Sequence, residues 1–443
     1  MKVIPRKASE SPGDGSSKAP SIDAKIQTQT KGQRLRARIQ FATLCWTMYL
    51  AGWNDGTTGP LLPRIQKVYN VNFTIVSLIF VFACIGFLTG AFSNLVLNHR
   101  YGFGKVTKFT LIHLQVIGYC IEAAAPPFPA FVLGYAINGI GMALQDAQAN
   151  GFVASIRDNA EAKMGLLHAA YGGCTLPASY SKPTSGAGAL SSPLVATQFA
   201  QLPHWSFHYL CSLGVAVLNT ILLIVVFGLK KQDDCLAQIG QPAGEEGTSE
   251  KSQFKQIFGL KDVHLLAFFI LVYVGVEVTM GGWIVTYIID VRRGGPSSGY
   301  ISSGFFGGLM FGRVALLWVN QKVGERRVLF MYAVLAIGLE FVVWFVPSLV
   351  GGAVSVSVIG FLLGPMYPIA MNHAGRVLPR WLLTGSIGWI AGFGQAGSAL
   401  LPFMTGAIAS KAGISALQPL LVAMMAFMTF LWALVPKGAH RTD

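Results

Sequence analysis

Several ionisable side chains lie within long apolar stretches of the chain, where an isolated charge is costly, and four of them are candidates for proton binding. They are Asp55, Asp146, His168 and Glu277. A carboxyl group in apolar surroundings, like an imidazole, can take up and release a proton near neutral pH. We therefore predict that these four side chains bind and release protons. The alternative is a structural group that bonds a neighbouring helix or, for Asp55, a polar cap at a kinked helix end.

A second set of amide and aromatic side chains could contact a small hydroxyl-rich solute. Amides supply hydrogen-bond donors and acceptors, and indole rings supply stacking surfaces. These substrate-binding candidates are Asn54, Gln145, Gln148, Asn150, Trp283, Asn372 and Trp389. Positions 146 and 150 share one helical face, which groups Asp146 with Asn150. Hydrogen bonding between helices and aromatic packing are the alternatives.

The elements that must position these residues are membrane-spanning helices. Hydrophobic residues make up 53% of the 443-residue chain and charged residues only 12%, about half the charged share of a soluble domain. A bilayer crossing needs about 20 apolar residues, and lipid-embedded backbone must satisfy its own hydrogen bonds. We therefore predict an all-α membrane protein with twelve transmembrane helices. The spans are expected near 39–60, 73–98, 106–125, 129–154, 161–200, 205–229, 263–288, 298–319, 328–346, 349–371, 382–409 and 414–435.

The two halves of the chain repeat at an offset of 222 residues. Asp55 then matches Glu277, and Gly59 matches Gly281. The match is densest over 98–106, which includes three identities and two like-charge exchanges. We predict two six-helix bundles, at 39–229 and 263–436. They are joined by a cytoplasmic central loop at 230–262 and flanked by a disordered basic tail at 1–38 and a short cytoplasmic tail at 437–443.

The repeat loses its register within the fifth predicted span. The match resumes at an offset of 209, so the first half carries 13 extra residues between Gly172 and Gly188. This stretch, near 173–187, contains Lys182 and two prolines, which oppose a continuous membrane helix. One hypothesis is an anomalous insert from a retained intron or a misplaced exon boundary. The alternative is a genuine re-entrant or outer loop between two half-helices.

The basic residues predict the orientation in the membrane. With the N-terminus in the cytoplasm, only five of the 33 Lys and Arg residues fall on outer segments, namely Arg64, Lys67, Arg292, Arg293 and Lys411. This asymmetry accounts for the net charge of +14 without a nucleic-acid partner. Both termini are expected in the cytoplasm, and the plasma membrane is the expected location.

Asn72 begins a sequon in the first outer loop and is a glycosylation candidate. Arg313 is expected to snorkel toward the cytoplasmic interface, and a role in a gate or in binding an anionic substrate is the alternative.

Several segments resemble the major facilitator superfamily. The loop NHRYGFGK at 98–105 resembles the basic loop between spans 2 and 3, although His99 replaces the usual Asp, and QKVGERR at 321–327 resembles its second copy. The resemblance implies a cytoplasmic gate formed by Arg100, Gly102, Lys105, Lys322, Gly324, Arg326 and Arg327. The segments VYVGVEVTMGGW, GWNDGTTGPLLPRIQ and LLHAAYG are similar to the fungal bypass-of-stop-codon transporters, a branch related to fucose permeases.

This resemblance implies a major facilitator fold that works by alternating access. The expected activity is proton-coupled transport, by symport or antiport, of a small and largely neutral organic solute. Uptake of a sugar-like nutrient and export of a secondary metabolite are both open. The competing interpretation is a non-transporting sensor or scaffold, or a pseudo-transporter disabled by the insert. We expect no enzyme activity, cofactor or metal. The expected partners are the solute, protons and the lipid bilayer, and the protein is expected to be a monomer.

Overall fold

The computed structural model describes residues 29–436, apart from positions 102, 157, 159, 173–187, 229, 242–255 and 379. The described part of the chain is helical and contains no strand. The N-terminal half contains α1 (Lys31–Tyr69), α2 (Phe73–Val76), α3 (Leu78–Tyr101), α4 (Phe103–Ala124), α5 (Phe128–Ala154), α6 (Ala160–Gly172), α7 (Gly188–Ala200), η1 (Trp205–Phe207) and α8 (His208–Phe227), followed by α9 (Gln232–Gln238). The C-terminal half contains α11 (Lys261–Asp290), η2 (Pro296–Gly299), α12 (Tyr300–Ala315), α13 (Leu317–Val323), α14 (Glu325–Phe345), α15 (Leu349–Leu363), α16 (Met366–Val377), α17 (Arg380–Ala412), η3 (Ile414–Ala416) and α18 (Leu417–Leu434). The all-α fold class is therefore confirmed.

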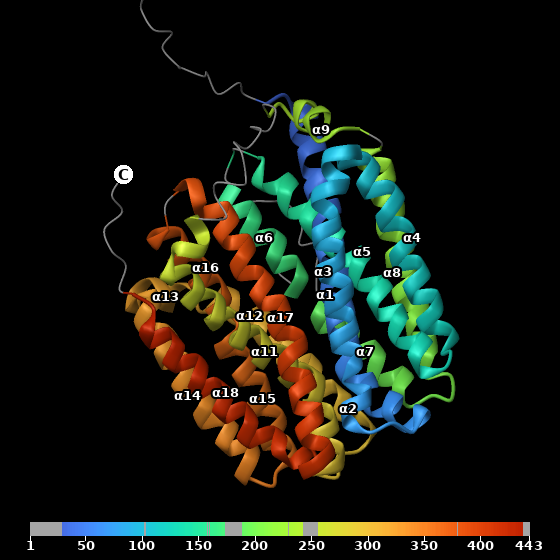
Figure 1. The fold of residues 1–443 in the computed structure, drawn as a ribbon, viewed down its shortest axis with the longest axis vertical. Helices are drawn as coiled ribbons and strands as arrows, with labels where there is room; N and C mark the ends of the chain where they lie inside the picture. Colours follow the sequence, from blue (N-terminus) through green and yellow to red (C-terminus); the bar gives the residue numbers. More distant parts are fainter. Residues whose placement is uncertain are drawn as a thin grey trace, which may run out of the picture.

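The helices run roughly along the long axis of the molecule in two groups (Figure 1). Each predicted span coincides with one helix or with consecutive helices. Among the described residues, seven helices are long and apolar enough to cross a membrane, or eight if the pair bent by 52° between Ala315 and Leu317 is one span. α1 begins and α18 ends at the same end of the molecule (Figure 1), which we call the terminal end. We call the opposite end, with α2, η1, η2 and η3, the far end.

The predicted repeat reappears as a repeated packing pattern. In the first half α3 and α4 pack on α5, and α1 packs on α7. The corresponding helices of the second half form the same pairs, because α12 and α14 pack on α15, and α11 packs on α17. The two halves thus use one arrangement twice.

The start of α1 differs from the sequence prediction. α1 begins at Lys31, within the segment predicted to be a disordered tail, because Thr30 caps it. The Thr30 hydroxyl accepts from the backbone N–H of Gln33 at 3.2 Å, and the Gln33 side chain accepts from the Thr30 N–H at 2.9 Å. This reciprocal capping box satisfies donors that the first helical turn leaves unpaired. The helix therefore continues beyond the apolar run from which its span was predicted.

A short helix, α9, forms within the predicted central loop. Its Cys235 and Leu236 side chains are fully buried and join an apolar cluster with residues of α1, α5, α6 and α8. The Gln232 side chain donates to the Ser155 hydroxyl at 2.7 Å. The start of this loop is therefore docked on the first half. The predicted insert at 173–187 lies outside the described residues, between the end of α6 and the start of α7.

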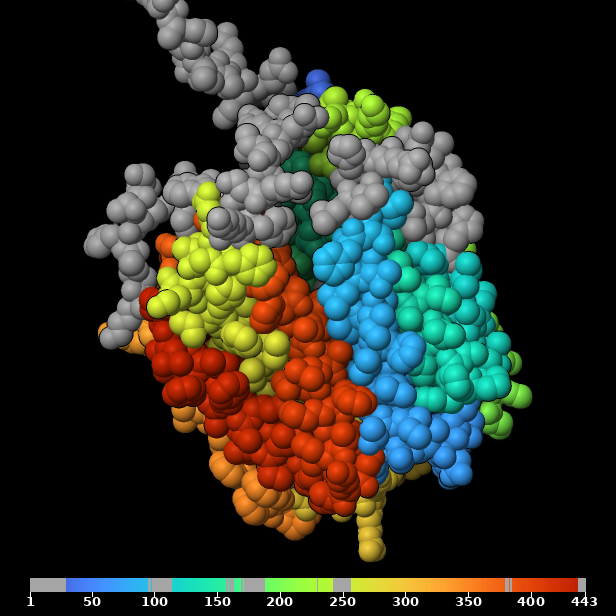
Figure 2. Space-filling model, in the orientation of Figure 1, coloured from blue at the N-terminus to red at the C-terminus, as the bar shows by residue number. Residues whose placement is uncertain are grey.

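The two halves are joined mainly near the far end. The backbone N–H and hydroxyl of Thr74 both donate to the Ser410 hydroxyl at 2.8 Å, and Gln198 donates to the Tyr300 hydroxyl. Figure 2 shows orange-red α17 touching blue α2 and α3 in the lower part of the view, with a hollow between the halves higher up. The two halves are therefore in contact at the far end and separated by a recess higher up in this view.

Candidate functional site between the two halves

A charged pair in the second half lies at mid-depth. The Arg313 guanidinium, on α12, lies 3.9 Å from the carboxylate of Glu277, on α11, and the two side chains are 20% and 12% exposed. Arg313 also donates through Nε to the Gly364 carbonyl at 3.3 Å. The side chain is thus directed to the interior, which corrects the expectation that it snorkels to the interface. A partner carboxylate lowers the cost of keeping a guanidinium at this depth.

The opposing wall of the first half carries Asp146 and Asn150. The Asn150 amide donates to the Asp146 carboxylate at 3.0 Å and to the Asp146 backbone carbonyl at 2.9 Å. Both side chains are half-buried. They form one polar group on α5, as the four-residue spacing predicted.

Electrostatic interactions link Asp55 and His168 to this region. Asp55 is exposed although it lies within α1, and it interacts with Asp146. His168, on α6, is also exposed and interacts with Arg313 across the two halves. An exposed polar side chain inside a helical bundle faces a space that water can reach. The structure therefore brings all four predicted proton-binding residues to one region between the halves.

Tyr367, on α16, completes the region and was not identified from the sequence. It interacts electrostatically with Asp146 of the first half and with Glu277 and Arg313 of the second. Tyrosine is common in helical cores, so its residue type gives no signal of this position. We call Asp55, Asp146, Asn150, His168, Glu277, Arg313 and Tyr367 the central cluster.

Three of the predicted substrate-binding amides instead bond neighbouring helices. Asn54 accepts from Asn138 at 2.8 Å, and Gln145 donates to Gln115 at 2.7 Å. Gln148 is buried and donates to a side chain of α3 at 2.7 Å. All these contacts lie within the first half. They favour the helix-packing alternative, so we leave these residues out of the site.

Both predicted tryptophans pack against protein. Trp283 is fully buried, donates to the Pro402 carbonyl at 3.0 Å, and lies edge-to-face on Phe73 with ring centroids 5.9 Å apart. Trp389 packs on Phe258 at 4.8 Å. Trp283 therefore belongs to the contact between the two halves at the far end. Trp389 packs beside the start of α11.

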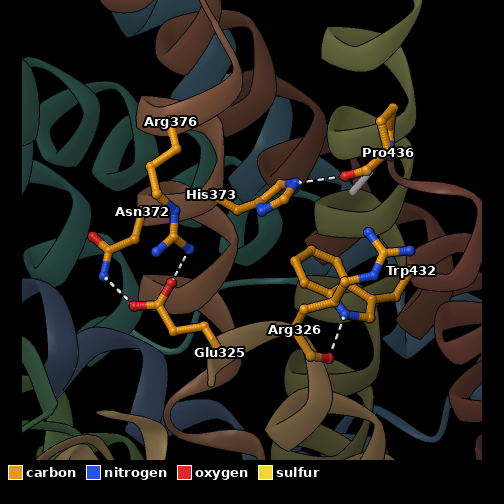
Figure 3. Close-up of polar contacts among 7 residues, drawn as sticks. All are labelled: Glu325, Arg326, Asn372, His373, Arg376, Trp432 and Pro436. Atoms are coloured by element: carbon orange, nitrogen blue, oxygen red, sulfur yellow. Dashed lines mark hydrogen bonds and ion pairs between the residues drawn. The ribbon is translucent and has the colours of Figure 1, made fainter. Parts of the chain in front are cut away.

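Asn372 lies at the terminal end rather than beside the central cluster. Its amide donates to Glu325 at 3.3 Å, and Arg376 pairs with the same carboxylate (Figure 3). Nearby, His373 contacts the Pro436 carbonyl at 3.2 Å (Figure 3). These contacts tie α14, α16 and the end of α18 together. The structure thus assigns Asn372 to helix packing, which corrects its assignment to substrate binding.

The second copy of the predicted gate loop also contacts its own half. The backbone carbonyl of Arg326 accepts from Trp432 Nε1 at 3.2 Å (Figure 3). Lys322 lies over the Trp318 ring at 4.8 Å, Arg327 is exposed, and Gly324 has a φ of 91°. In the first copy, Gly102 and the side chains of Arg100 and Lys105 lie outside the described residues.

Two buried carboxyl groups carry no assigned role. Glu122 on α4 and Glu340 on α14 are 1% and 0% exposed, and neither has a hydrogen-bond partner of good geometry among the described residues. The sequence shows both as acids in corresponding spans of the two halves. The described residues contain no group of three or more His, Cys, Asp or Glu that could hold a metal ion.

The outer-loop asparagine serves as a helix cap. The Asn72 side-chain oxygen accepts from the Ile75 N–H at 2.8 Å at the start of α2. The residue is exposed, and its glycosylation stays a prediction.

A family model for the Major Facilitator Superfamily matches residues 44–380. The chain belongs to this superfamily. The match begins within α1, runs through the link between the halves and ends at the start of α17.

Individual relatives agree with this assignment. Bypass of stop codon protein 6 of Saccharomyces cerevisiae is 25% identical over 423 residues, covering 89% of this chain and 82% of the yeast protein. The glucose/mannose transporter GlcP of Bacillus subtilis is 22% identical over 360 residues, covering 79% and 83%. The crystal structure of a D-xylose-proton symporter superposes with a TM-score of 0.73 at 12% identity, covering 91% and 99%. The predicted resemblance to the bypass-of-stop-codon branch is confirmed.

Proposed function

We propose that this facilitator moves a small, largely neutral, sugar-like solute by alternating access and couples that movement to protons. The observation that carries the proposal is the central cluster, in which Tyr367 interacts with Glu277 and Arg313 of one half and with Asp146 of the other. The relative named a glucose/mannose transporter supports the solute class, and the fold neighbour named a proton symporter supports the coupling.

The ion pair offers a simple route to coupling. While Glu277 is ionised, it holds the Arg313 guanidinium at 3.9 Å. When Glu277 takes up a proton its negative charge disappears, and the attraction that fixes Arg313 is lost. Arg313 can then donate to a solute oxygen. The proton and the solute thereby depend on each other, which is the requirement for coupled transport.

Asp146 and Asn150 supply the matching half of the solute site. A carboxylate accepts hydrogen bonds, and an amide both donates and accepts them, so the pair suits vicinal hydroxyl groups. Because the two walls belong to different halves, a solute held between them would be exposed to one side at a time as the halves rock.

The test is transport by purified protein in proteoliposomes, with radiolabelled glucose, mannose, galactose and xylose. We expect Glu277→Gln to abolish accumulation driven by a proton gradient and to leave exchange of solute across the membrane. The amide cannot release a proton, although it retains most of the shape of the carboxyl. Asp262→Asn, at the start of the same helix, is the matched control and should behave as the wild type. Full pH-dependent accumulation by Glu277→Gln would remove Glu277 from the coupling.

The same cluster serves uptake or export, because coupling works in both directions. Deletion of the gene distinguishes them in cells. Loss of solute uptake would establish import, whereas higher cell-associated metabolite and greater sensitivity to it would establish export. If the purified protein moves no solute in either direction, the alternative of a sensor, scaffold or disabled transporter takes its place.

A further inference from the structure

The contact between the halves includes two glycines that leave no space for a side chain. Gly59 on α1 lies against Gly281 on α11, and a Cβ atom at position 59 would overlap the Gly281 carbonyl. These two residues are repeat equivalents at the 222-residue offset. In a two-fold arrangement, equivalent residues meet one another only on the axis. At Gly59 the helix α1 therefore lies directly against the backbone of α11, close to the pseudo-two-fold axis.

A second backbone contact lies nearer the far end. A Cβ atom at Gly406 on α17 would lie 2.6 Å from the Phe73 carbonyl oxygen and 2.7 Å from the Ser77 side chain. Beside it, Thr74 donates to Ser410. Gly59 and Gly406 thus mark two points at which a helix of one half lies directly against the backbone of the other half, and we call them the glycine seam.

We propose that the glycine seam sets the conformational equilibrium of this transporter by allowing the far end to close. Rotamer changes cannot relieve an overlap between a Cβ atom and a backbone carbonyl, so an added methyl group must separate the two halves there. The methyl group costs little in a state whose far end is already open. It therefore shifts the population toward that state, because only a difference between states moves an equilibrium. This inference rests on the proposed alternating access, but not on any solute or on protons.

The chain supplies a matched control. A Cβ atom at Gly90 on α3 would lie 2.5 Å from the Ile140 carbonyl, which is within the same half. A methyl group at this position strains the first bundle whether the far end is open or closed. Gly90→Ala therefore reports general damage, whereas Gly59→Ala and Gly406→Ala report separation of the halves.

Two introduced cysteines, one on each side of the contact between the halves, report the conformation through their accessibility. Ser302 is fully buried beside the seam, and its hydroxyl donates to the Gly281 carbonyl at 3.5 Å. Gly165 on α6 is exposed, with no neighbour within 4 Å of its Cβ position. In membrane vesicles, Ser302→Cys and Gly165→Cys are labelled with an impermeant maleimide from either side. Site-resolved mass spectrometry separates these reporters from the native cysteines.

We expect Gly59→Ala and Gly406→Ala each to raise far-side labelling of Ser302→Cys, and to lower terminal-side labelling of Gly165→Cys, by about tenfold, the scale on which one overpacked methyl group shifts an equilibrium. Gly90→Ala should leave both rates unchanged. If Gly59→Ala fails to give a monodisperse protein, Gly406→Ala decides. Unchanged labelling in a folded seam variant, or the same change in Gly90→Ala, would overturn the inference. Shifted labelling without transport of any sugar would instead count against the proposed function.

Discussion

Arg313 and Glu277 carry opposite charges within the helical bundle, and both are largely buried. The pair lies 3.9 Å apart and is mostly shielded from solvent, so each charge depends on the other. Removing one partner of a buried pair costs about 3–5 kcal/mol. The longer contact and partial exposure here reduce the expected cost to about 1–2 kcal/mol.

We therefore predict that Arg313→Gln lowers the unfolding temperature in detergent, and that Glu277→Gln added to it restores at least half of the loss. The second change removes the carboxylate that the first leaves unpaired. Fluorescence-monitored thermal unfolding of the two single variants and the double variant measures this coupling. Additive losses would show that the pair contributes nothing to stability.

At the scale of the element, α9 is attached to the bundle rather than free in solution. Leu236 is fully buried, and the Gln40 side chain lies 3.5 Å from the Cys235 carbonyl. Burial also raises the pKa of the Cys235 thiol, which suppresses the reactive thiolate. Undocking of α9 would expose the thiol and restore its ordinary reactivity.

We predict that Leu236→Ala accelerates the reaction of Cys235 with a maleimide, because truncating a buried leucine costs about 2–5 kcal/mol and this side chain holds α9 in the apolar cluster. The rate is measured by mass spectrometry on folded protein. Gln238→Ala, on the same helix, is the control. Equal rates in wild type and Leu236→Ala would mean that α9 remains docked without this side chain.

At the scale of the whole molecule, the prediction concerns sidedness. Among the residues that the structure describes, most Lys and Arg residues lie toward the terminal end, and basic segments remain in the cytoplasm. Gly32 and Gln321 are exposed at the terminal end, and Gly295 is exposed at the far end. If the protein resides in the plasma membrane, an impermeant maleimide should label Gly295→Cys on intact cells, and Gly32→Cys and Gln321→Cys only after permeabilisation. Labelling of Gly32→Cys and Gln321→Cys from opposite sides would contradict the proposed topology.

The sequence by itself determined the helical class and showed the repeat, and it singled out four ionisable residues as candidates. Composition and apolar run length depend only on residue type, and Asp55, Asp146, His168 and Glu277 stand out because ionisable groups are rare in such runs. Residue type did not show which of the polar amides and tryptophans face a solute and which pack against another helix. An amide such as Gln145 has the same chemistry whether it faces a solute or another helix, and only the packing of α4 on α5 decided between them.

The tertiary structure alone decided which charges meet and where the halves touch. Arg313 lies 36 residues from Glu277 in the chain, and no local pattern links them. Gly59 and Gly281 were visible as repeat equivalents, but their contact required two bundles to be placed about one axis. Contacts between distant segments depend on how the helices pack, and sequence periodicity describes one helix at a time.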